Sequence, residues 1–487
     1  MGDPRRWRAL AVLALVQFMI AIDNTVVNVA LPSVQRSLGM SPTGLAWVVN
    51  GYLLAAGGLL LLGGRVADLV GRRRIFLIGT AVFALASLTA GTAQSGGALI
   101  ASRFGQGIGE ALAAPAALSL VPILFADQKE RIKALGIWGA IAGLGAMVGV
   151  LLSGVLVDFV GWRAIFLLNL PIAVIPLVLV PRLTNENRSP EVGRSLDLPG
   201  AVLVTAGVGG VVYGLLNATG HAWSSLSVTG PLVAGLILLA LFVSVESRSR
   251  SPLVPMRFFA NRTRVSANLC TVIVAGTMMS MFFLIVLYVQ QGLGFSPLQS
   301  GLAYIPFMVA FAPGIGLSTN LLPRLGSRVI IVVGFLVAAG GMLLFSQVPA
   351  NGSYLADVLP GMVVLGFGLG LVNPALQNAA LHEVSDTDAG LASGIQTTVM
   401  QAGSALGLAA LVTISLRHSA TAVATGMAPH AAAAAGDRLA FLIAAFALAA
   451  GAVLAAVLFQ SPARGAGATA GPVPAAAVPA EAPQPGG

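Results

Sequence analysis

Apolar runs of about 20 residues recur along almost the whole of this chain, which is the length needed to cross a hydrocarbon core of roughly 30 Å as an α-helix. The chain has 487 residues and only 9% of them are charged, against about 25% in soluble proteins. The sequence therefore predicts an all-α protein that crosses a lipid bilayer many times, and it excludes an ordinary soluble globule.

The apolar runs are separated by short segments that carry charges, glycine or proline. Fourteen spans are expected, at residues 9–31, 45–64, 75–95, 97–125, 134–157, 164–181, 198–217, 227–246, 265–288, 299–321, 329–348, 355–378, 389–416 and 437–460. The first follows the basic segment MGDPRRWR, but its apolar run is too long for a signal peptide, so we expect it to stay uncleaved. An even number of spans places both termini on one side of the membrane.

Lysine and arginine are distributed unevenly between the two sets of loops. The termini and the loops after even-numbered spans hold 21 of them, whereas the other loops hold four, at positions 36, 163, 417 and 438. Because basic loops stay on the cytoplasmic side, both termini are expected in the cytoplasm. The excess of arginine over lysine is typical of a GC-rich bacterial genome, which favours the bacterial inner membrane. Since the basic residues are scattered, nucleic acid is not expected as a partner.

Two pairs of segments repeat at nearly the same spacing. The Gly-x-Gly and following Pro of residues 107–115 recur at 366–374, an offset of 259 residues. The Gly-x-Arg and following Gly of residues 71–79 recur at 326–334, an offset of 255 residues. Span 4 therefore corresponds to span 12, and the loop after span 2 to the loop after span 10. Secondary transporters are often built from such repeats, with the substrate site between the halves near the midplane.

The repeat predicts five parts of the chain. Two six-helix bundles are expected at residues 9–181 and 265–460, with two inserted helices and their flanking cytoplasmic loops at 182–264. Residues 1–8 form a short cytoplasmic N-terminus. Residues 461–487 are rich in Pro, Ala and Gly and cannot bury a core, so they are expected to be a disordered cytoplasmic tail.

Several motifs resemble the major facilitator superfamily, in its fourteen-helix drug/proton antiporter branch. They are AIDNTVVNVALP in span 1, GGRVADLVGRRRI after span 2, Arg103 with Gln106 and Gly107 in span 4, and GWRAIFLLNLP at residues 161–171. The resemblance covers residues 9–460. It implies the major facilitator fold and proton-driven drug export by alternating access, with no cofactor.

The loop after span 2 is expected to control the conformational change. Gly64 and Gly71 can take backbone angles that other residues avoid. The resemblance implies that Asp68, flanked by Arg72 and Arg73, engages a neighbouring helix end or a basic partner and latches the state that is closed to the inside. The alternative is simple anchoring by the basic residues, with a solvated acid.

Span 5 departs from the pattern of the branch. Exporters of this type usually carry Gly-Pro and then Gly-Gly, whereas this chain has Gly149-Val150 and Ser153-Gly154. The missing proline removes a local helix perturbation, which puts the usual gating role of Gly149 and Gly154 in question. The span 5 glycines are still expected to permit close helix packing, at positions 139, 143, 145, 149 and 154.

Two charged residues are expected to meet inside the membrane. At 1.5 Å per helical residue, Asp23 lies about 12 Å from the outer end of span 1, and Arg103 about 9 Å from the outer end of span 4. A pair would offset part of the cost of each charge, which is roughly 3 kcal/mol on insertion scales. Spans 1 and 4 are neighbours in the superfamily, so Asp23 and Arg103 are candidates for proton coupling.

Glu110 is a third charged residue at membrane depth. It lies seven residues after Arg103, so both share one face of span 4, and it falls about 20 Å from the outer end, with no basic residue within a turn. The branch usually has a small residue there. Glu110 is therefore a candidate to bind a proton or a cationic substrate, while a structural hydrogen bond and surface exposure stay open as alternatives.

Further polar or polarizable residues are candidates for substrate contact. Asn373 with Gln377, and Thr397 with Gln401, are four residues apart and share a helix face in each case. Hydrogen bonding between helices is an equally good interpretation. The segment TMMSMFF at residues 277–283 could form an adaptable wall for ligands, because Met is flexible and polarizable, and a lipid-facing role is as good for it. The full set of candidates is Asn28, Gln106, Glu110, Met281, Asn373, Gln377, Gln396 and Gln401.

The sequence carries no signature of an ATPase, an enzyme or a metal site. There is no Gly-x-x-x-x-Gly-Lys-Ser/Thr segment, the four histidines lack metal-ligand spacing, and Cys270 is the single cysteine. We therefore predict a proton-coupled, monomeric exporter of amphipathic cationic drugs or antibiotics. Alternatives are a dedicated exporter of one endogenous metabolite and, more distantly, a non-transporting membrane enzyme or receptor.

Overall fold

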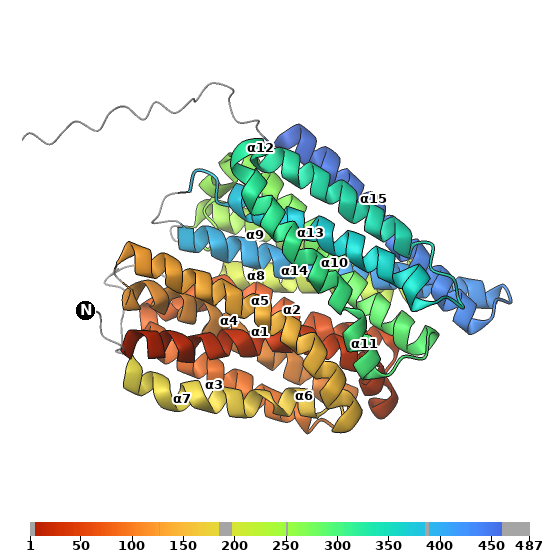
Figure 1. Ribbon diagram of the computed structural model, residues 1–487, viewed down its shortest axis with the longest axis horizontal. Helices are drawn as coiled ribbons and strands as arrows, with labels where there is room; N and C mark the ends of the chain where they lie inside the picture. The colour runs from red at the N-terminus through yellow and green to blue at the C-terminus, as the bar shows by residue number, and fades with distance from the viewer. Residues whose placement is uncertain (1–4, 126, 185–196, 250–251, 385–388, 460–487) are drawn as a thin grey trace, which may run out of the picture.

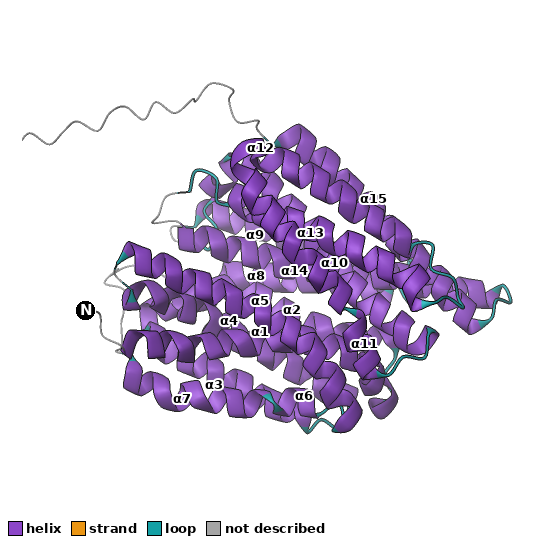
Figure 2. Ribbon diagram, viewed as in Figure 1, coloured by secondary structure: helices purple, strands orange, loops and turns teal. Residues whose placement is uncertain are grey.

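The computed structural model describes residues 5–125, 127–184, 197–249, 252–384 and 389–459. All regular secondary structure in these residues is helical (Figure 2). The expected tail at 461–487 lies outside the described residues, as do residues 1–4 of the expected N-terminal segment. The all-α fold expected from the apolar runs is confirmed.

The first bundle begins with four long helices in antiparallel succession. The bounds are α1 Arg5–Leu38, α2 Pro42–Val70, α3 Arg72–Gly91, α4 Gly96–Leu124, α5 Gln128–Phe159, α6 Ala164–Leu167 and α7 Asn169–Leu183. Ser41, Ser95 and Asp127 cap α2, α4 and α5, because each side chain accepts a hydrogen bond from the backbone N–H three residues on. Each of these caps thus marks where a turn ends and the next helix of the chain begins.

The rest of the chain supplies an inserted hairpin and the second bundle. The inserted helices are α8 Leu198–Asn217 and α9 Leu226–Arg248, followed by the short helical turn η1 Met256–Ala260. The second bundle comprises α10 Arg262–Leu287, η2 Tyr288–Gly292, α11 Pro297–Ala303, α12 Ile305–Phe345, η3 Tyr354–Val358, α13 Leu359–Ala380, α14 Ala389–Ala424 and α15 Pro429–Leu458. In Figure 1 the helices of the two bundles are inclined to one another.

One long helical element, α12, crosses the bundle twice. Among the described residues 13 helical stretches are long and apolar enough to cross a membrane, and one of them includes all of α12. Gly326 interrupts α12 with φ 74° and ψ 162°. A Cβ built on Gly314 in the first arm would lie 2.5 Å from the Phe367 carbonyl of α13, and one on Gly334 in the second arm would lie 3.0 Å from the Gly368 carbonyl. Both arms therefore pack on α13. When the two arms of α12 are counted separately, the 13 stretches become the fourteen crossings expected.

Each bundle has a glycine with positive φ at the equivalent position of its repeat. Gly71, between α2 and α3, has φ 128°, and its counterpart Gly326 separates the two arms of α12. Both positions need glycine, because other residues rarely adopt positive φ.

The repeated Gly-x-Gly pairs also make equivalent contacts. Gly107 packs on the Tyr52 carbonyl of α2, and Gly366 on the Phe307 carbonyl of the first arm of α12. The next glycines of the pairs, at 109 and 368, pack on α3 and on the second arm of α12. The internal repeat seen in the sequence is thus a repeat of packing.

The inserted hairpin lies against both bundles. Thr205 of α8 packs on Gly58 of α2, and Leu215 of α8 accepts a hydrogen bond of 2.9 Å through its carbonyl from the Thr413 hydroxyl of α14. Because α2 and α14 belong to different bundles, α8 covers the line along which they meet. We call the end of the molecule that carries the loop at 71 the basic end, and the end that carries the loop at 160–163 the opposite end.

Three sequence expectations differ from the structure. Helices α14 and α15 extend past the expected spans 13 and 14, so Arg417 and Arg438 lie in helices and not in loops; in Figure 1 this blue hairpin projects at the right. Gly64 lies inside α2 and has no positive φ, so the special backbone angle is needed only at Gly71. Arg36 likewise lies within α1.

The span 5 glycines divide into two groups. Those at 145, 149 and 154 pack closely, as expected, on Ala21, Ile22 and Leu298. The expectation is wrong for Gly139 and Gly143, where a built Cβ would have nothing within 4 Å. The helix is packed in its second half and leaves a face open toward the basic end.

Candidate functional site

Asp23 and Arg103 form a buried ion pair, as the depth argument predicts. The Arg103 Nη1 donates to Asp23 Oδ2 at 2.5 Å, and the side-chain exposures are 2% and 0%. The other oxygen of Asp23, Oδ1, accepts from Gln106 Nε2 at 2.9 Å and from Asn169 Nδ2 at 2.8 Å. Arg103 also donates through Nε to the Val48 carbonyl of α2 at 3.1 Å. Helices α1, α2, α4 and α7 thus share one polar network.

This network suits an ionised Asp23. A buried carboxylate is tolerated only where charge-assisted hydrogen bonds replace its water, and here three donors reach its two oxygens. Asn169 was not among the sequence candidates. Its signal was nevertheless present, because it is the asparagine of the GWRAIFLLNLP segment. Removing one partner would leave a buried charge unpaired, which is strongly destabilising.

Tyr52 of α2 covers the ion pair on one side. The Arg103 guanidinium carbon lies 4.3 Å from the centre of the Tyr52 ring, and 6.0 Å from that of Phe166 in α6. The Tyr52 hydroxyl accepts a hydrogen bond of 3.0 Å from Asn24 Nδ2 of α1. The guanidinium is therefore held by a carboxylate and by aromatic faces, which favours a fixed cation.

Glu110 is buried and faces the second bundle. Its exposure is 5%, which excludes the alternative of surface exposure. Its Oε1 lies 3.4 Å from Gln401 Nε2 of α14, a long hydrogen bond between the bundles. The other oxygen, Oε2, has no hydrogen-bond partner among the described residues. Unlike Asp23, Glu110 keeps acceptor capacity for a ligand.

The structure separates the other substrate candidates by environment. Gln106 is buried, and both ends of its amide are used, by Asp23 and Ser87 on one side and by Arg103 on the other. Asn28 is buried with Oδ1 unpartnered among the described residues, and Met281 is fully buried in the apolar core. A substrate can reach Gln106 or Met281 only if the packing around it changes.

The candidates of the second bundle lie partly in the open. Gln377 Nε2 donates to Asn373 Oδ1 at 3.0 Å, which confirms that the two share a face of α13, and Gln377 is exposed. Gln396 is half-buried on α14. Gln401 is buried and contacts Glu110, so two residues predicted separately from the two halves meet at the bundle interface.

At the basic end, the charged residues of the loop after α2 contact helices of their own bundle. Asp68 Oδ1 accepts from Arg72 Nε at 2.9 Å, one turn on along the chain. Arg72 also donates to the Ser119 carbonyl of α4 at 3.3 Å, and Arg73 to the Thr184 carbonyl after α7 at 2.8 Å. These contacts hold Asp68, Arg72 and Arg73 to helices of the first half of the chain, and the predicted latch role of Asp68 stays a prediction.

At the opposite end the two bundles touch directly. A Cβ built on Gly154 of α5 would lie 2.8 Å from the Leu298 Cα of α11. Four residues on, Asp158 Oδ2 accepts from the Ser296 hydroxyl at 2.9 Å and from the Leu298 N–H at 3.0 Å. Gln290 Nε2 of η2 donates to the Val29 carbonyl of α1 at 2.9 Å. Gln291 Nε2 of η2 likewise donates to Gln35 Oε1 of α1 at 3.0 Å. Backbone packing and these four hydrogen bonds therefore join the bundles here.

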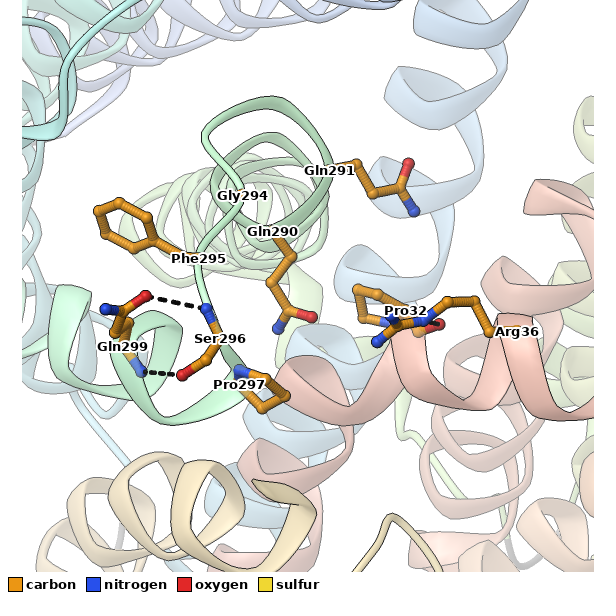
Figure 3. Close-up of a pocket in the computed structure, with 9 residues that line it drawn as sticks. All are labelled: Pro32, Arg36, Gln290, Gln291, Gly294, Phe295, Ser296, Pro297 and Gln299. Atoms are coloured by element: carbon orange, nitrogen blue, oxygen red, sulfur yellow. Dashed lines mark hydrogen bonds between the residues drawn. The ribbon is translucent and has the colours of Figure 1, made fainter. Parts of the chain in front are cut away.

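A cavity of about 570 Å³ lies on the same seam. Figure 3 shows Pro32 and Arg36 of α1 on one side and the segment from η2 to α11 on the other, with Gln290 directed toward α1. Ser296 and Gln299 fix the start of α11 through a capping box, in which each side chain accepts a hydrogen bond from the backbone N–H of the other residue. The cavity walls come from both bundles, so its shape depends on the contact between them.

Residues 13–408 match the model of the Major Facilitator Superfamily. The chain belongs to this superfamily. It is 40% identical to the puromycin resistance protein pur8 of Streptomyces alboniger over 433 residues. The aligned region covers 88% of this chain and 86% of that protein. It is also 40% identical over 411 residues to the lincomycin resistance protein of Streptomyces lincolnensis, with 84% of each chain covered.

Other members of the superfamily extend the comparison. The multidrug resistance protein Stp of Mycobacterium tuberculosis is 36% identical over 398 residues, 81% of this chain and 73% of that protein. Among solved structures, a bacterial homolog of the human lysosomal transporter Spinster matches with a TM-score of 0.67 at 18% identity, covering 94% of this chain and 98% of the other. The superfamily fold is therefore shown by sequence and by structure.

No metal centre is evident in the part of the chain that the structure describes. No group of three or more His, Cys, Asp or Glu side chains there is arranged to hold a metal ion. Cys270 is buried in α10. The charged residues buried in the described part of the chain are Asp23, Arg103, Glu110, Asp197, Glu246 and Asp437.

Proposed function

We propose that this protein is a proton-coupled exporter of amphipathic, cationic drugs or antibiotics that works by alternating access. Its relatives are named as resistance proteins for puromycin and lincomycin and as a multidrug resistance protein. The observation that carries the charge preference is Glu110, a buried carboxyl at the bundle interface with one oxygen free of partners among the described residues. We place the protein in the bacterial inner membrane, with cytoplasmic termini, as a monomer without a cofactor.

In this proposal the two acids have different roles. Asp23 stays ionised, because Arg103, Gln106 and Asn169 all donate to it, and it holds the first bundle together. Glu110 binds either a lipophilic cation or a proton. Because both ligands compete for one carboxylate, protonation from outside releases the cation, and loss of the proton inside restores the site.

The proton gradient supplies enough energy for this exchange. One proton that moves through 100 mV releases about 2.3 kcal/mol, and each unit of pH difference adds about 1.4 kcal/mol. A site with walls from both bundles can face either side of the membrane when the bundles rock about it. Glu110 on α4 and Gln401 on α14 are such a pair of walls.

The test compares a cationic with a neutral drug in an efflux-deficient host. Wild-type protein should raise resistance to both, and an uncoupler should abolish the effect. Glu110→Gln should lower resistance to the cation at least tenfold more than to the neutral drug, because it removes the charge and keeps the shape. Equal losses for the two drugs would exclude charge recognition by Glu110, and resistance that survives the uncoupler would exclude proton coupling.

Asp23→Asn serves as the matched control for loss of a buried charge. It leaves the Arg103 guanidinium without its carboxylate, so we expect a lower melting temperature of the purified protein together with loss of transport of both drugs. Glu110→Gln should melt close to wild type, because no ion-pair partner reaches Glu110 among the described residues. If Glu110→Gln unfolds as readily as Asp23→Asn, its role is structural.

A dedicated exporter of one compound is the second candidate. Two relatives are named for resistance to single antibiotics, and another is named as a cephamycin export protein. A resistance panel decides between the candidates, since a dedicated exporter should protect against one chemical class only. Enzymatic activity is not part of the proposal, because the chain belongs to a transporter superfamily.

A further inference from the structure

Asn50 of α2 is a fully buried polar residue whose side chain makes no hydrogen bond with the described residues. Its exposure is 0%, and neither Nδ2 nor Oδ1 finds a partner in that part of the chain. Water satisfies both atoms of an exposed amide, so burying the amide without replacement raises the free energy of the state that encloses it. The cost falls on whichever arrangement of the helices covers Asn50.

Helix geometry places Asn50 at the interface between the bundles. Gly57 follows it on α2 after seven residues, which is nearly two turns, so the two residues share one face. A Cβ built on Gly57 would lie 2.6 Å from the Gln401 Cβ of α14, so this face meets the second bundle. One and two turns beyond Gln401 toward the opposite end, α14 carries Ala405 and Leu408, both fully buried. The surface of α14 at the level of Asn50 is therefore apolar.

Asn50 also lies in the half of α2 nearest to the joined end. It follows Pro42, the first residue of α2, by eight residues, or about 12 Å along the helix. The bundles are joined at this end by the packing of Gly154 on α11 and by the bond from Gln290 to α1. Joining the bundles encloses the amide of Asn50, and parting them at this end lets water reach it.

We infer that Asn50 is a positioning residue of the transport cycle, whose unpartnered amide limits the stability of the joined state so that the opposite end can open. The inference rests on the proposed function, because alternating access requires this end to open to the outside in each cycle. It names a residue that sets the balance between the two states and does not require contact with the substrate.

The experiment measures how often the opposite end opens in cells that express the full-length protein. Val150→Cys is the reporter, in a Cys270→Ala background. Val150 is buried and lies four residues before Gly154, on the face of α5 that packs on α11. A membrane-impermeant maleimide added outside labels it only when the bundles part, so the labelling rate follows the open population. The reporter and Asn50 lie on different pairs of helices, so the rate reports opening of the whole end.

Substitutions of Asn50 that keep its branching should act in opposite directions. Asn50→Leu replaces the amide by an apolar group that favours burial, so labelling should be at least about tenfold slower than in the unsubstituted reporter protein. Asn50→Val, which is smaller, should also slow labelling and guards against overpacking by leucine. Asn50→Asp introduces a carboxyl, which costs more to bury than an amide, so labelling should be severalfold faster. If neither apolar variant slows labelling, the inference is overturned.

Ser318→Ala is the matched control, because it removes a buried hydroxyl within one bundle. Ser318 is fully buried, and its Oγ has no hydrogen-bond partner among the described residues. It follows Gly314 by four residues, and Gly314 packs on the Phe367 carbonyl of α13, so this face lies inside the second bundle. Ser318→Ala should leave the labelling rate within about twofold of the reporter protein. A tenfold slowing here as well would show that the interface position of Asn50 is irrelevant, and the inference would fail.

Failure of the inference is distinguishable from failure of the proposed function. If the reporter protein with Asn50 intact is never labelled from outside, the opposite end does not open, and alternating access fails together with the inference. If that protein is labelled and the Asn50 variants match its rate, only the role of Asn50 is overturned.

Discussion

The two ends of the molecule join their bundles in different ways. At the opposite end Asp158 of the first bundle accepts two hydrogen bonds from the start of α11, and Gly154 packs on backbone atoms of the same segment. At the basic end Asp68 pairs with Arg72 in its own bundle, and the glycines of α5 nearest to that end have no neighbour within 4 Å of a built Cβ. Similar acids near helix ends thus serve different purposes, one between bundles and one within a bundle.

This difference indicates which state the structure represents. Alternating access requires that one end be joined while the other is free to admit substrate, and the contacts place the join at the opposite end. If the basic loops lie in the cytoplasm, as the charge distribution predicts, the end at which the bundles are joined faces the outside. The contacts at the opposite end must then break in each transport cycle.

The largest change is expected from Gly154→Leu. A Cβ at this position would lie 2.8 Å from the Leu298 Cα and 2.9 Å from the Pro297 carbonyl, and backbone atoms cannot move aside as a side chain can. Overpacking of this kind costs about 1–3 kcal/mol, so the joined state should lose at least about fivefold in population. Spin labels at Gln94→Cys and Asn351→Cys, in a Cys270→Ala background, should report a longer distance across the opposite end.

Gly139→Leu provides the control for this change. It adds the same side chain to the same helix, at a site where a built Cβ meets nothing within 4 Å. The distance distribution between the labels should match that of wild type. A similar lengthening with both variants would mean that the seam between α5 and α11 does not hold the opposite end closed.

A smaller change is expected from Asp158→Asn. The amide keeps one acceptor oxygen but loses the charge that Ser296 and Leu298 share, so the joined state should lose up to about fivefold in population, as is usual for an exposed charged contact. The same pair of labels measures it. Asp357→Asn is the control, because Asp357 accepts from the Ser353 N–H inside the second bundle, at 2.7 Å.

Much of this comparison could not be predicted from the sequence. Hydropathy and the internal repeat predicted the helices. Depth along the helices predicted that Asp23 and Arg103 meet, because a rise of 1.5 Å per residue fixes the level of each side chain in the membrane. The same reasoning does not tell how each helix is rotated about its own axis relative to its neighbours. It therefore missed Asn169 and Tyr52 as partners of the ion pair, and it treated Gly139 like Gly149 although only Gly149 faces a neighbouring helix.

Asp158 was missed for a related reason. Its partners lie 138 and 140 residues away in sequence, on a turn whose position depends on how the two bundles dock. Glu110 and Gln401 were each chosen as polar residues at membrane depth, and only the docking of α4 near α14 shows that they meet. Sequence thus predicted which polar residues are unusual, while tertiary packing decides which of them are partners.

The smallest change in this state is expected from Asp68→Asn. Its pairing with Arg72 lies within one bundle and is half-buried, so its loss should leave the distance between spin labels at Arg74→Cys and Arg324→Cys unchanged within error. Transport should nevertheless slow severalfold if Asp68 latches the state closed at the basic end. Removing stabilisation from a scarcely populated state hardly alters the resting distribution, yet it lowers the rate at which that state is reached. A shift in the resting distance as large as that from Asp158→Asn would show that both ends are held alike, and the comparison would fail.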